Sequence, residues 1–115
     1  MRTKIYIAGP VSGLPNYNHH AFVQAAQEVH ALGFDAINPH TLCRHVNPDD
    51  WHACLKICLH HLVLCNGIYM LKGWQNSKGA TLERSVAMQL NIPVHYSLDE
   101  LGQLSQTIYS QLINQ

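Results

Sequence analysis

The sequence has few charged residues and no feature typical of a membrane or nucleic-acid protein. Only 12% of its 115 residues are charged, about half of the usual quarter. Lysine plus arginine number 7, and so do aspartate plus glutamate, whereas a nucleic-acid binder normally has a basic excess. No apolar run approaches the roughly 18 residues of a membrane-spanning helix. We therefore expect neither a nucleic-acid polymer nor a membrane as partner.

The chain also lacks a linker, an internal repeat and a low-complexity stretch. The apolar segment 5–8 is too short for the core of a signal peptide, which predicts a cytoplasmic protein. The length suits one domain and is too short for two, so residues 1–115 are interpreted as a single domain. The low charge suggests that another subunit covers part of the surface, as in a homodimer or larger homo-oligomer.

The four cysteines follow no zinc framework, and the sequence has no C-x-x-C motif. Cys54, Cys58 and His61 share one face of a predicted helix, where a metal site is conceivable. The simpler interpretation, which we adopt, treats the cysteines as small buried hydrophobes in a reducing compartment. Dinucleotide and P-loop signatures are also missing. The sequence thus predicts no metal and no cofactor.

What the sequence does contain is a regular alternation of strand-like and helix-like segments. Apolar runs predict strands at 3–8, 34–37, 67–71 and 92–95, and amphipathic segments predict helices at 18–32, 47–64, 79–90 and 97–113. Strands that are apolar throughout indicate a parallel sheet with helices on both faces. Right-handed crossovers and a single reversal of winding predict the strand order 2-1-3-4.

The third predicted helix carries the carboxylate that we consider most informative, Glu83. Its neighbours one turn away are small or apolar, so an ion pair within the helix is excluded. Helical side chains lean toward the helix N-terminus, which points Glu83 at the strand ends. The positive end of the helix should also keep the carboxylate ionised, as a nucleophile requires. The alternative is a solvated charge on the helix dipole. On the same helix we expect Leu82, Val86 and Leu90 to face the core.

Two loops meet at the edge of the sheet where ligands of parallel α/β folds bind. Segments 9–17 and 72–79 follow the first and third strands, whose carboxyl ends flank the switch point. Ser12 and Gly13 would then face Ser77 and Gly79 across a crevice. Hydroxyls and the free N–H groups of a helix N-terminus suit a phosphate, although a cap and a turn explain Ser77 and Gly79 equally well.

Three aromatic residues complete the set that we single out. Tyr17, at the end of the first loop, can donate a hydrogen bond to a sugar or carboxylate, or be a partly buried amphipathic ring. Trp74 lies in a polar loop, where it can stack on a flat base. Tyr6 lies in the first strand and has packing as its simplest role. The pairs His19–His20 and His60–His61 are interpreted as exposed or satisfied histidines.

Together these residues resemble the nucleoside 2-deoxyribosyltransferase-like superfamily, in particular a small branch of unknown function that is common in phages and prophages. The resemblance covers nearly the whole chain. It is carried by Ile5-Tyr6-Ile7-Ala8-Gly9-Pro10, Ser12-Gly13, Tyr17-Asn18, Asn38-Pro39, Gly73-Trp74 and Ser77-x-Gly79-x-x-x-Glu83.

The resemblance implies a flavodoxin-like three-layer sandwich and cleavage of the N-glycosidic bond of a nucleoside or nucleoside 5′-monophosphate. By this likeness Glu83 attacks the anomeric carbon, and water or a second base then completes hydrolysis or transfer. Serines such as Ser12 and Ser77 lie near the phosphate, and a tyrosine such as Tyr17 positions the sugar. Tyr6 of the first strand and Gly9 and Pro10 of the loop after it are expected to line the substrate site. Relatives often complete the site with a neighbouring subunit.

The sequence departs from this pattern at the start of the third strand. Relatives commonly carry a Cys-Asp pair there, and this chain has Cys65-Asn66. An amide still forms hydrogen bonds but cannot act as a general acid at neutral pH. His40 and Asp49 are weak substitutes for the missing acid. The alternative function is therefore a nucleotide-binding or sequestering protein without turnover.

Overall fold

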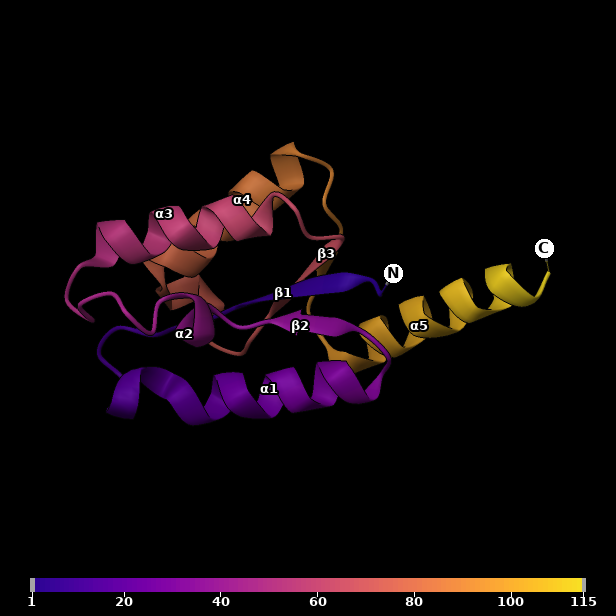
Figure 1. The fold of residues 1–115 in the computed structure, drawn as a ribbon, viewed down its shortest axis with the longest axis horizontal. Coiled ribbons are helices and arrows are strands. Elements are labelled where there is room, and N and C mark those ends of the chain that lie inside the picture. The colour runs from indigo at the N-terminus through magenta and orange to yellow at the C-terminus, as the bar shows by residue number, and fades with distance from the viewer. Residues whose placement is uncertain (1, 115) are drawn as a thin grey trace.

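A computed structural model describes residues 2–114 and shows the α/β fold expected from the sequence. Four parallel strands lie in the order β2-β1-β3-β4, which confirms the predicted 2-1-3-4 topology of a flavodoxin-like fold (Figure 1). They are β1 (Lys4–Ala8), β2 (Asp35–Ile37), β3 (Gly67–Met70) and β4 (Val94–His95). The winding reverses between β1 and β3, so the switch point lies at the carboxyl ends of these two strands.

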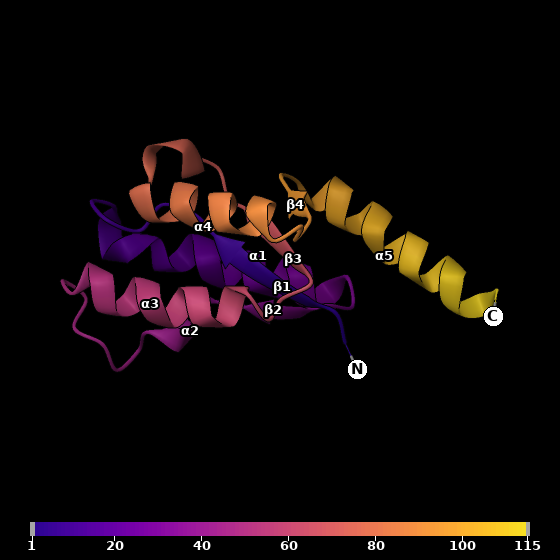
Figure 2. The ribbon, with the colours of Figure 1, turned by 90° about the horizontal axis from the view of Figure 1, so that it is seen from above.

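Helices cover both faces of the sheet. The main helices are α1 (His19–Ala31), α2 (Pro39–Leu42), α3 (Trp51–Leu62), α4 (Lys78–Gln89) and α5 (Leu98–Ile113), with short turns η1 (Pro15–Asn18) and η2 (Trp74–Asn76). Figures 1 and 2 show α3 and α4 over one face, with α1 and the start of α5 over the other. Side chains of the central strand β1 alternate between these layers: Ile5 packs toward α1 and α5, and Tyr6 toward α3 and α4.

The inward face of α4 differs from the face that the sequence predicted. Leu82 and Leu90 are 40% and 53% exposed, whereas Ala80, Glu83 and Ala87 are buried. The prediction is therefore wrong for Leu82 and Leu90, whereas Val86 packs against the core as expected. Two alanines bring the helix backbone close to the sheet, and the buried ring of Tyr6 occupies the space beneath it. This rotation turns Glu83 into the core.

Helix α3 begins later than predicted, at Trp51. The Asp50 side chain caps it by accepting a hydrogen bond from the Ala53 amide at 3.1 Å. Asn47, the expected cap, instead accepts from the Asp49 amide at 2.9 Å and closes a separate turn. The segment before α3 thus folds as a loop, which leaves room for the cavities described below.

Gly9 directly follows β1, where packing against Leu71 leaves no room for a side chain. A Cβ at this position would lie 2.8 Å from the Leu71 Cβ, and Leu71 is buried. We expect Gly9→Ala to lower the free energy of unfolding by about 1–3 kcal/mol, the usual cost of overpacking, as measured by urea denaturation. The control is Gly102→Ala in α5, where an added Cβ meets no packed neighbour and the helix gains stability. Equal stability of Gly9→Ala and the unmodified protein would contradict this explanation.

The last helix, α5, leaves the body of the molecule partway along its length (Figures 1 and 2). Its first half is anchored, because Leu101 is fully buried and the Ser105 hydroxyl donates to the Leu32 carbonyl at 2.9 Å. Its second half carries the exposed side chains of Tyr109 and Ile113. Within residues 2–114, no helix combines the length and apolar character needed to cross a membrane.

Candidate functional site

Glu83 and Tyr6 form a buried hydrogen-bonded pair between α4 and the central strand. The Glu83 side chain is 6% exposed, and its Oε2 accepts a hydrogen bond from the Tyr6 hydroxyl. Within the described residues the carboxyl has no cationic partner, and the salt bridge that is present joins Arg2 to Asp35 on the surface. Burial raises the pKa of Glu83 to about 7, although the Tyr6 hydrogen bond opposes the rise. The expectation that the helix N-terminus keeps Glu83 fully ionised is therefore corrected.

Tyr6 has more than the packing role that its sequence position suggested. Burial and the neighbouring Glu83 charge raise its pKa well above the usual tyrosine range, so the phenol stays protonated and can donate. Cys58 of α3 packs in the same buried cluster as Tyr6. It also lines the cavity at Glu83 described next. Cys58, Tyr6 and Glu83 thus lie together in the core.

A cavity of about 110 Å³ opens above Glu83 at the switch point. Its wall brings together Gly9 and Ser12 from the loop after β1 with Ser77 and Gly79 from the start of α4. The sequence predicted this grouping around Glu83. The Ser77 oxygen accepts from the Ala80 amide at 3.1 Å, so Ser77 is a helix cap whose hydroxyl proton is still available to a ligand.

A second cavity of about 210 Å³ adjoins the first, because Val11, Pro39, Pro48 and Cys54 line both. Its polar lining consists of Tyr17, His40, Arg44 and Asn47. The Nε2 atom of His40 is buried without a hydrogen-bond partner among the described residues. Burial also lowers the pKa of His40, so its ring is neutral at neutral pH and can donate or accept.

Tyr17 belongs to this second cavity and not to the wall around Glu83. It is 42% exposed and adopts a positive φ of 53°, between two asparagines that are also left-handed. The Asn18 amide fixes this turn by donating to the Pro10 carbonyl at 2.9 Å, so Asn18 does not cap α1. Neither Pro10 nor Gly13 lines either cavity.

Trp74 lies apart from Glu83. Its ring packs 6.0 Å from that of Tyr96, with the Arg84 guanidinium 4.9 Å above it. Together with Tyr69 and Asp99, it lines an open depression of about 700 Å³. This depression lies on the other side of the loop that follows β3. The structure therefore does not place Trp74 where it can stack on a base held at Glu83. That depression contains no buried ionisable group comparable to Glu83, despite its larger size.

Asn66 also lies away from the two cavities. It precedes β3, and its exposed side chain accepts a hydrogen bond from the Lys4 amide at 2.9 Å. The amino ends of parallel strands lie at the opposite edge from their carboxyl ends, where Ser12 and Ser77 meet. Asn66 thus lies at the amino end of β3, and the argument that its amide replaces a catalytic acid does not apply.

The sequence analysis missed Trp51 and Cys58, which both line the Glu83 cavity. The indole of Trp51 lies close to the Gly79 backbone and beneath the Lys78 ammonium, 4.9 Å from the ring centre. Trp51, Cys58 and Leu62 recur at i, i+7 and i+11, a spacing that puts them on one helical face. That periodicity was the available signal.

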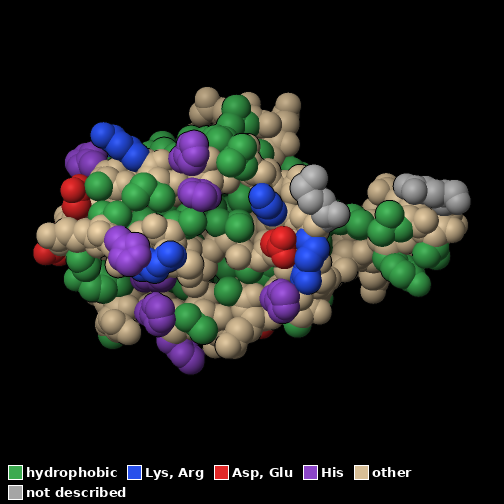
Figure 3. Space-filling model, viewed as in Figure 1, with side chains coloured by type: hydrophobic (Ala, Val, Ile, Leu, Met, Phe, Trp, Pro, Cys, Tyr) green, Lys and Arg blue, Asp and Glu red, His purple; other side chains and the backbone are tan. Residues whose placement is uncertain are grey.

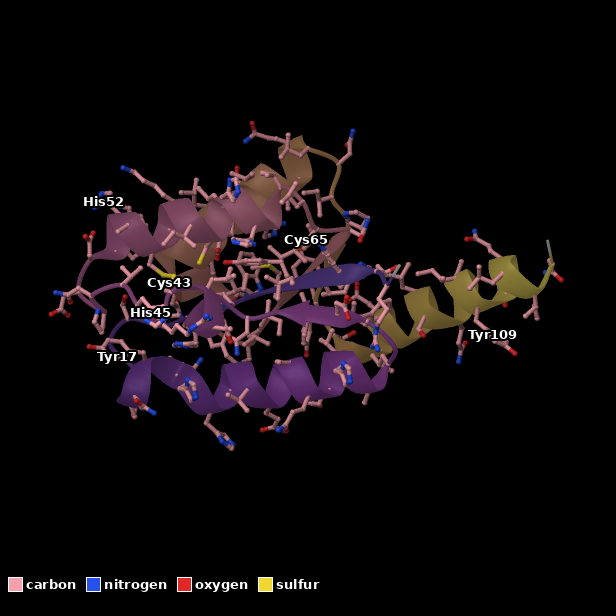
Figure 4. All side chains as sticks on the ribbon, in the orientation of Figure 1. Tyr17, Cys43, His45, His52, Cys65 and Tyr109 are labelled. Carbon is pink, nitrogen blue, oxygen red and sulfur yellow. A yellow bond between two sulfur atoms is a disulfide. The ribbon has the colours of Figure 1, made fainter. Side chains whose placement is uncertain are left out.

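Two of the four cysteines depart from the expectation of free thiols. Cys43 and Cys54 form a disulfide, and the Cα atoms are 5.5 Å apart. Cys58 and Cys65 are free and buried. The sequence analysis grouped Cys54 only with Cys58 and His61, its neighbours on the same predicted helix. The loop after α2 brings in Cys43 from outside that helix, as the position of Cys43 near α2 and α3 in Figure 4 shows.

The surface shows the charge balance that the composition predicted. On the face in Figure 3, lysine and arginine side chains of the described residues are scattered among histidines and form no continuous stripe. Acidic side chains on this face are equally sparse. This face does not resemble the basic surface of a nucleic-acid binder.

Comparison with known proteins gives one family match. A family model described as a domain of unknown function, DUF4406, matches residues 3–96. This region contains all four strands, both switch-point loops and Glu83, and it ends before α5. No curated protein matches the chain.

Proposed function

We propose that this protein, which belongs to the DUF4406 family of unknown function, cleaves the N-glycosidic bond of a nucleoside or nucleoside 5′-monophosphate. The observation that carries the proposal is the Glu83 carboxyl, buried at the base of a cavity and hydrogen-bonded by Tyr6. A buried carboxyl without a cation is costly for a fold, so a chemical role is a reasonable explanation. The resemblance to nucleoside 2-deoxyribosyltransferase-like proteins supports the same chemistry.

The proposed reaction has two steps. The ionised Glu83 carboxylate attacks the anomeric carbon, the carbon–nitrogen bond breaks, and the base leaves with the bonding electrons and takes a proton from solvent. A glycosyl ester on Glu83 results. Water then attacks the same carbon and releases the sugar and the free carboxylate, while a second base in place of water gives transfer. Tyr6 acts as a positioning residue that orients the carboxylate.

The two adjoining cavities suit the two halves of such a substrate. The cavity at Glu83 alone is small, but both together reach the lower end of the roughly 300–1,000 Å³ typical of ligand sites. We assign the sugar to the Glu83 cavity, with Ser12 and Ser77 toward its 5′ end. The base then enters the second cavity, where His40 Nε2 supplies an unpartnered polar atom.

A substrate panel tests the proposal directly. The protein is incubated with nucleosides and nucleoside 5′-monophosphates in ribose and deoxyribose forms, and free base is measured by chromatography. Release of base from at least one class supports the proposal. A thermal shift without base release favours the alternative, a nucleotide-binding or sequestering protein. Neither shift nor release with any compound contradicts both.

Tyr6→Phe is expected to move the pH dependence of base release. The Tyr6 hydrogen bond lowers the pKa of Glu83, so its loss raises that pKa further and leaves less carboxylate at neutral pH. We expect a several-fold fall in kcat/KM at pH 7 that recovers at higher pH, seen as an upward shift of the midpoint of the pH–rate profile. A uniform fall at every pH, with the midpoint unchanged, would show that Tyr6 has only a packing role.

A homodimer or larger assembly also stays a prediction. The inward rotation of Glu83 leaves Leu82, Met88 and Leu90 of α4 more than a third exposed, which is consistent with a covered surface. Light scattering at micromolar concentration measures the assembly state, and a monomer would remove this prediction.

The cytoplasmic location likewise stays a prediction, to be checked by fractionation of expressing cells.

A further inference from the structure

Three cysteine sulfurs lie together beside the two cavities. Cys43 follows α2, while Cys54 and Cys58 are one turn apart on α3. The free Cys58 sulfur is 3.6 Å from that of Cys43 and 3.9 Å from that of Cys54. These two distances are nearly equal, so Cys58 lies beside the disulfide and not in line with it. Cys65 is a free buried thiol outside this group, as its separate position in Figure 4 shows.

We propose that Cys43, Cys54 and Cys58 form a thiol–disulfide exchange site in which Cys43 changes its partner from Cys54 to Cys58. The Cys58 thiol loses its proton to solvent, and the thiolate attacks the Cys43 sulfur. The Cys43–Cys54 bond breaks, its electron pair leaves on the Cys54 sulfur, and that thiolate takes up a proton. One disulfide and one thiol are present before and after, so the step needs no external oxidant or reductant. In-line attack requires one cysteine side chain to change its rotamer.

The cavities give the three sulfurs different access to solvent. Cys43 and Cys54 are half-buried and line the second cavity, so a small external thiol can reach their disulfide. Cys58 is 3% exposed and lines the Glu83 cavity, where the nearest sulfurs are those of the disulfide. This arrangement favours internal exchange over direct oxidation of Cys58. It also disfavours a metal site, because the disulfide occupies two of the three sulfurs.

Exchange would change the surroundings of Tyr6 and Glu83. Cys58 packs in the same buried cluster as Tyr6, whose hydroxyl donates to Glu83, and it lines the same cavity as Glu83. A Cys58 sulfur that joins Cys43 in a disulfide changes its position and its packing at this place. A change in the disulfide partner of Cys43 would thus change the environment of Glu83. This inference does not depend on the proposed N-glycosidic activity.

The first test uses single-cysteine variants oxidised with a small disulfide such as oxidised glutathione. In Cys54→Ser we expect a Cys43–Cys58 disulfide, detected as the loss of two hydrogens in intact mass and as a cross-linked peptide. In Cys58→Ser we expect Cys43–Cys54 alone. Cys65→Ser is the matched control and should behave as the unmodified protein. The inference is overturned if Cys54→Ser stays fully reduced, or carries only glutathione, while Cys58→Ser oxidises completely.

The second test uses the unmodified protein and so does not depend on how a variant folds. The oxidised protein is held at pH 7, 8 or 9, alkylated, and digested to map its disulfides. We expect both Cys43–Cys54 and Cys43–Cys58 isomers, forming about tenfold faster per pH unit because only the thiolate attacks. Burial raises the pKa of Cys58 to about 11, so the rate should not level off in this range. A single isomer at every pH would overturn exchange.

A third measurement tests whether the disulfide state affects Glu83. The carboxyl carbon of Glu83 is titrated by NMR in reduced and in oxidised Cys54→Ser, two states that differ only in the disulfide. Because Cys58 packs beside Tyr6 and lines the Glu83 cavity, its repositioning in the disulfide should shift the Glu83 midpoint between the two states. Identical midpoints would leave the exchange site without influence on Glu83 and overturn that part of the inference.

Discussion

Glu83→Gln is expected to abolish base release, with a fall of roughly 10⁴-fold or more in kcat/KM. Glutamine has nearly the same shape and still offers an oxygen to the Tyr6 hydroxyl, but it cannot form the glycosyl ester. Because the fold and cavity are kept, the thermal shift given by a bound substrate should remain. This combination separates loss of the nucleophile from loss of the site. The measurement is base release on the best substrate of the panel.

The matched control is Glu28→Gln on α1, across the sheet from the cavities. It removes the same charge from the same residue type without touching the site, so its kcat/KM should stay within about twofold of the unmodified protein. If Glu83→Gln retains activity close to that of Glu28→Gln, Glu83 is not the nucleophile. The covalent mechanism would then have to be abandoned even if the protein releases base.

The second large effect concerns stability, which Glu83 should make dependent on pH. Its pKa is raised from 4.5 to about 7 in the folded protein, so the folded state binds this proton more tightly than the unfolded state does. The stabilisation is fully present below pH 4.5, where both states are protonated, and is lost as pH rises through 7. The difference in pKa corresponds to about 3 kcal/mol of unfolding free energy.

Urea denaturation of the unmodified protein and of Glu83→Gln between pH 4 and 8.5 measures this effect. Glutamine does not titrate, so Glu83→Gln should become the more stable of the two as pH rises, with the gap approaching a constant above pH 8. Other groups titrate equally in both proteins, and the comparison removes them. A constant difference across the whole range would show that the buried carboxyl has an ordinary pKa.

The sequence predicted the sheet well because each strand is a short apolar run and each connection is long enough for a helix that crosses between parallel strands. It failed on α4, where hydrophobicity alone favours Leu82 over Glu83 as the inward residue. The deciding factor is the Tyr6 hydroxyl, a hydrogen-bond partner 77 residues away in the chain. A pattern within one helix contains no information about such a distant partner.

The site was predicted in part for similar reasons. Topology correctly brought Ser12 and Ser77 to one cavity, because both follow strands that end at the switch point. The same topology places Asn66, at the beginning of β3, at the opposite edge of the sheet from the cavities. The sequence analysis nevertheless counted Asn66 as a site residue, because it followed the resemblance to a family. The Cys43–Cys54 disulfide depends on the path of an irregular loop, for which sequence periodicity offers no guide.

The cavities and the final turns of α5 lie far apart in the molecule. Tyr17 and the cavities lie at one end, and Tyr109 on the projecting half of α5 lies at the other (Figure 4). The long dimension of 48 Å separates these ends, and the contacts of α5 with the core extend only to Ile108. The final turns of α5 therefore offer a handle for tethering the protein to a support or fusing a reporter, with both cavities left open to solvent.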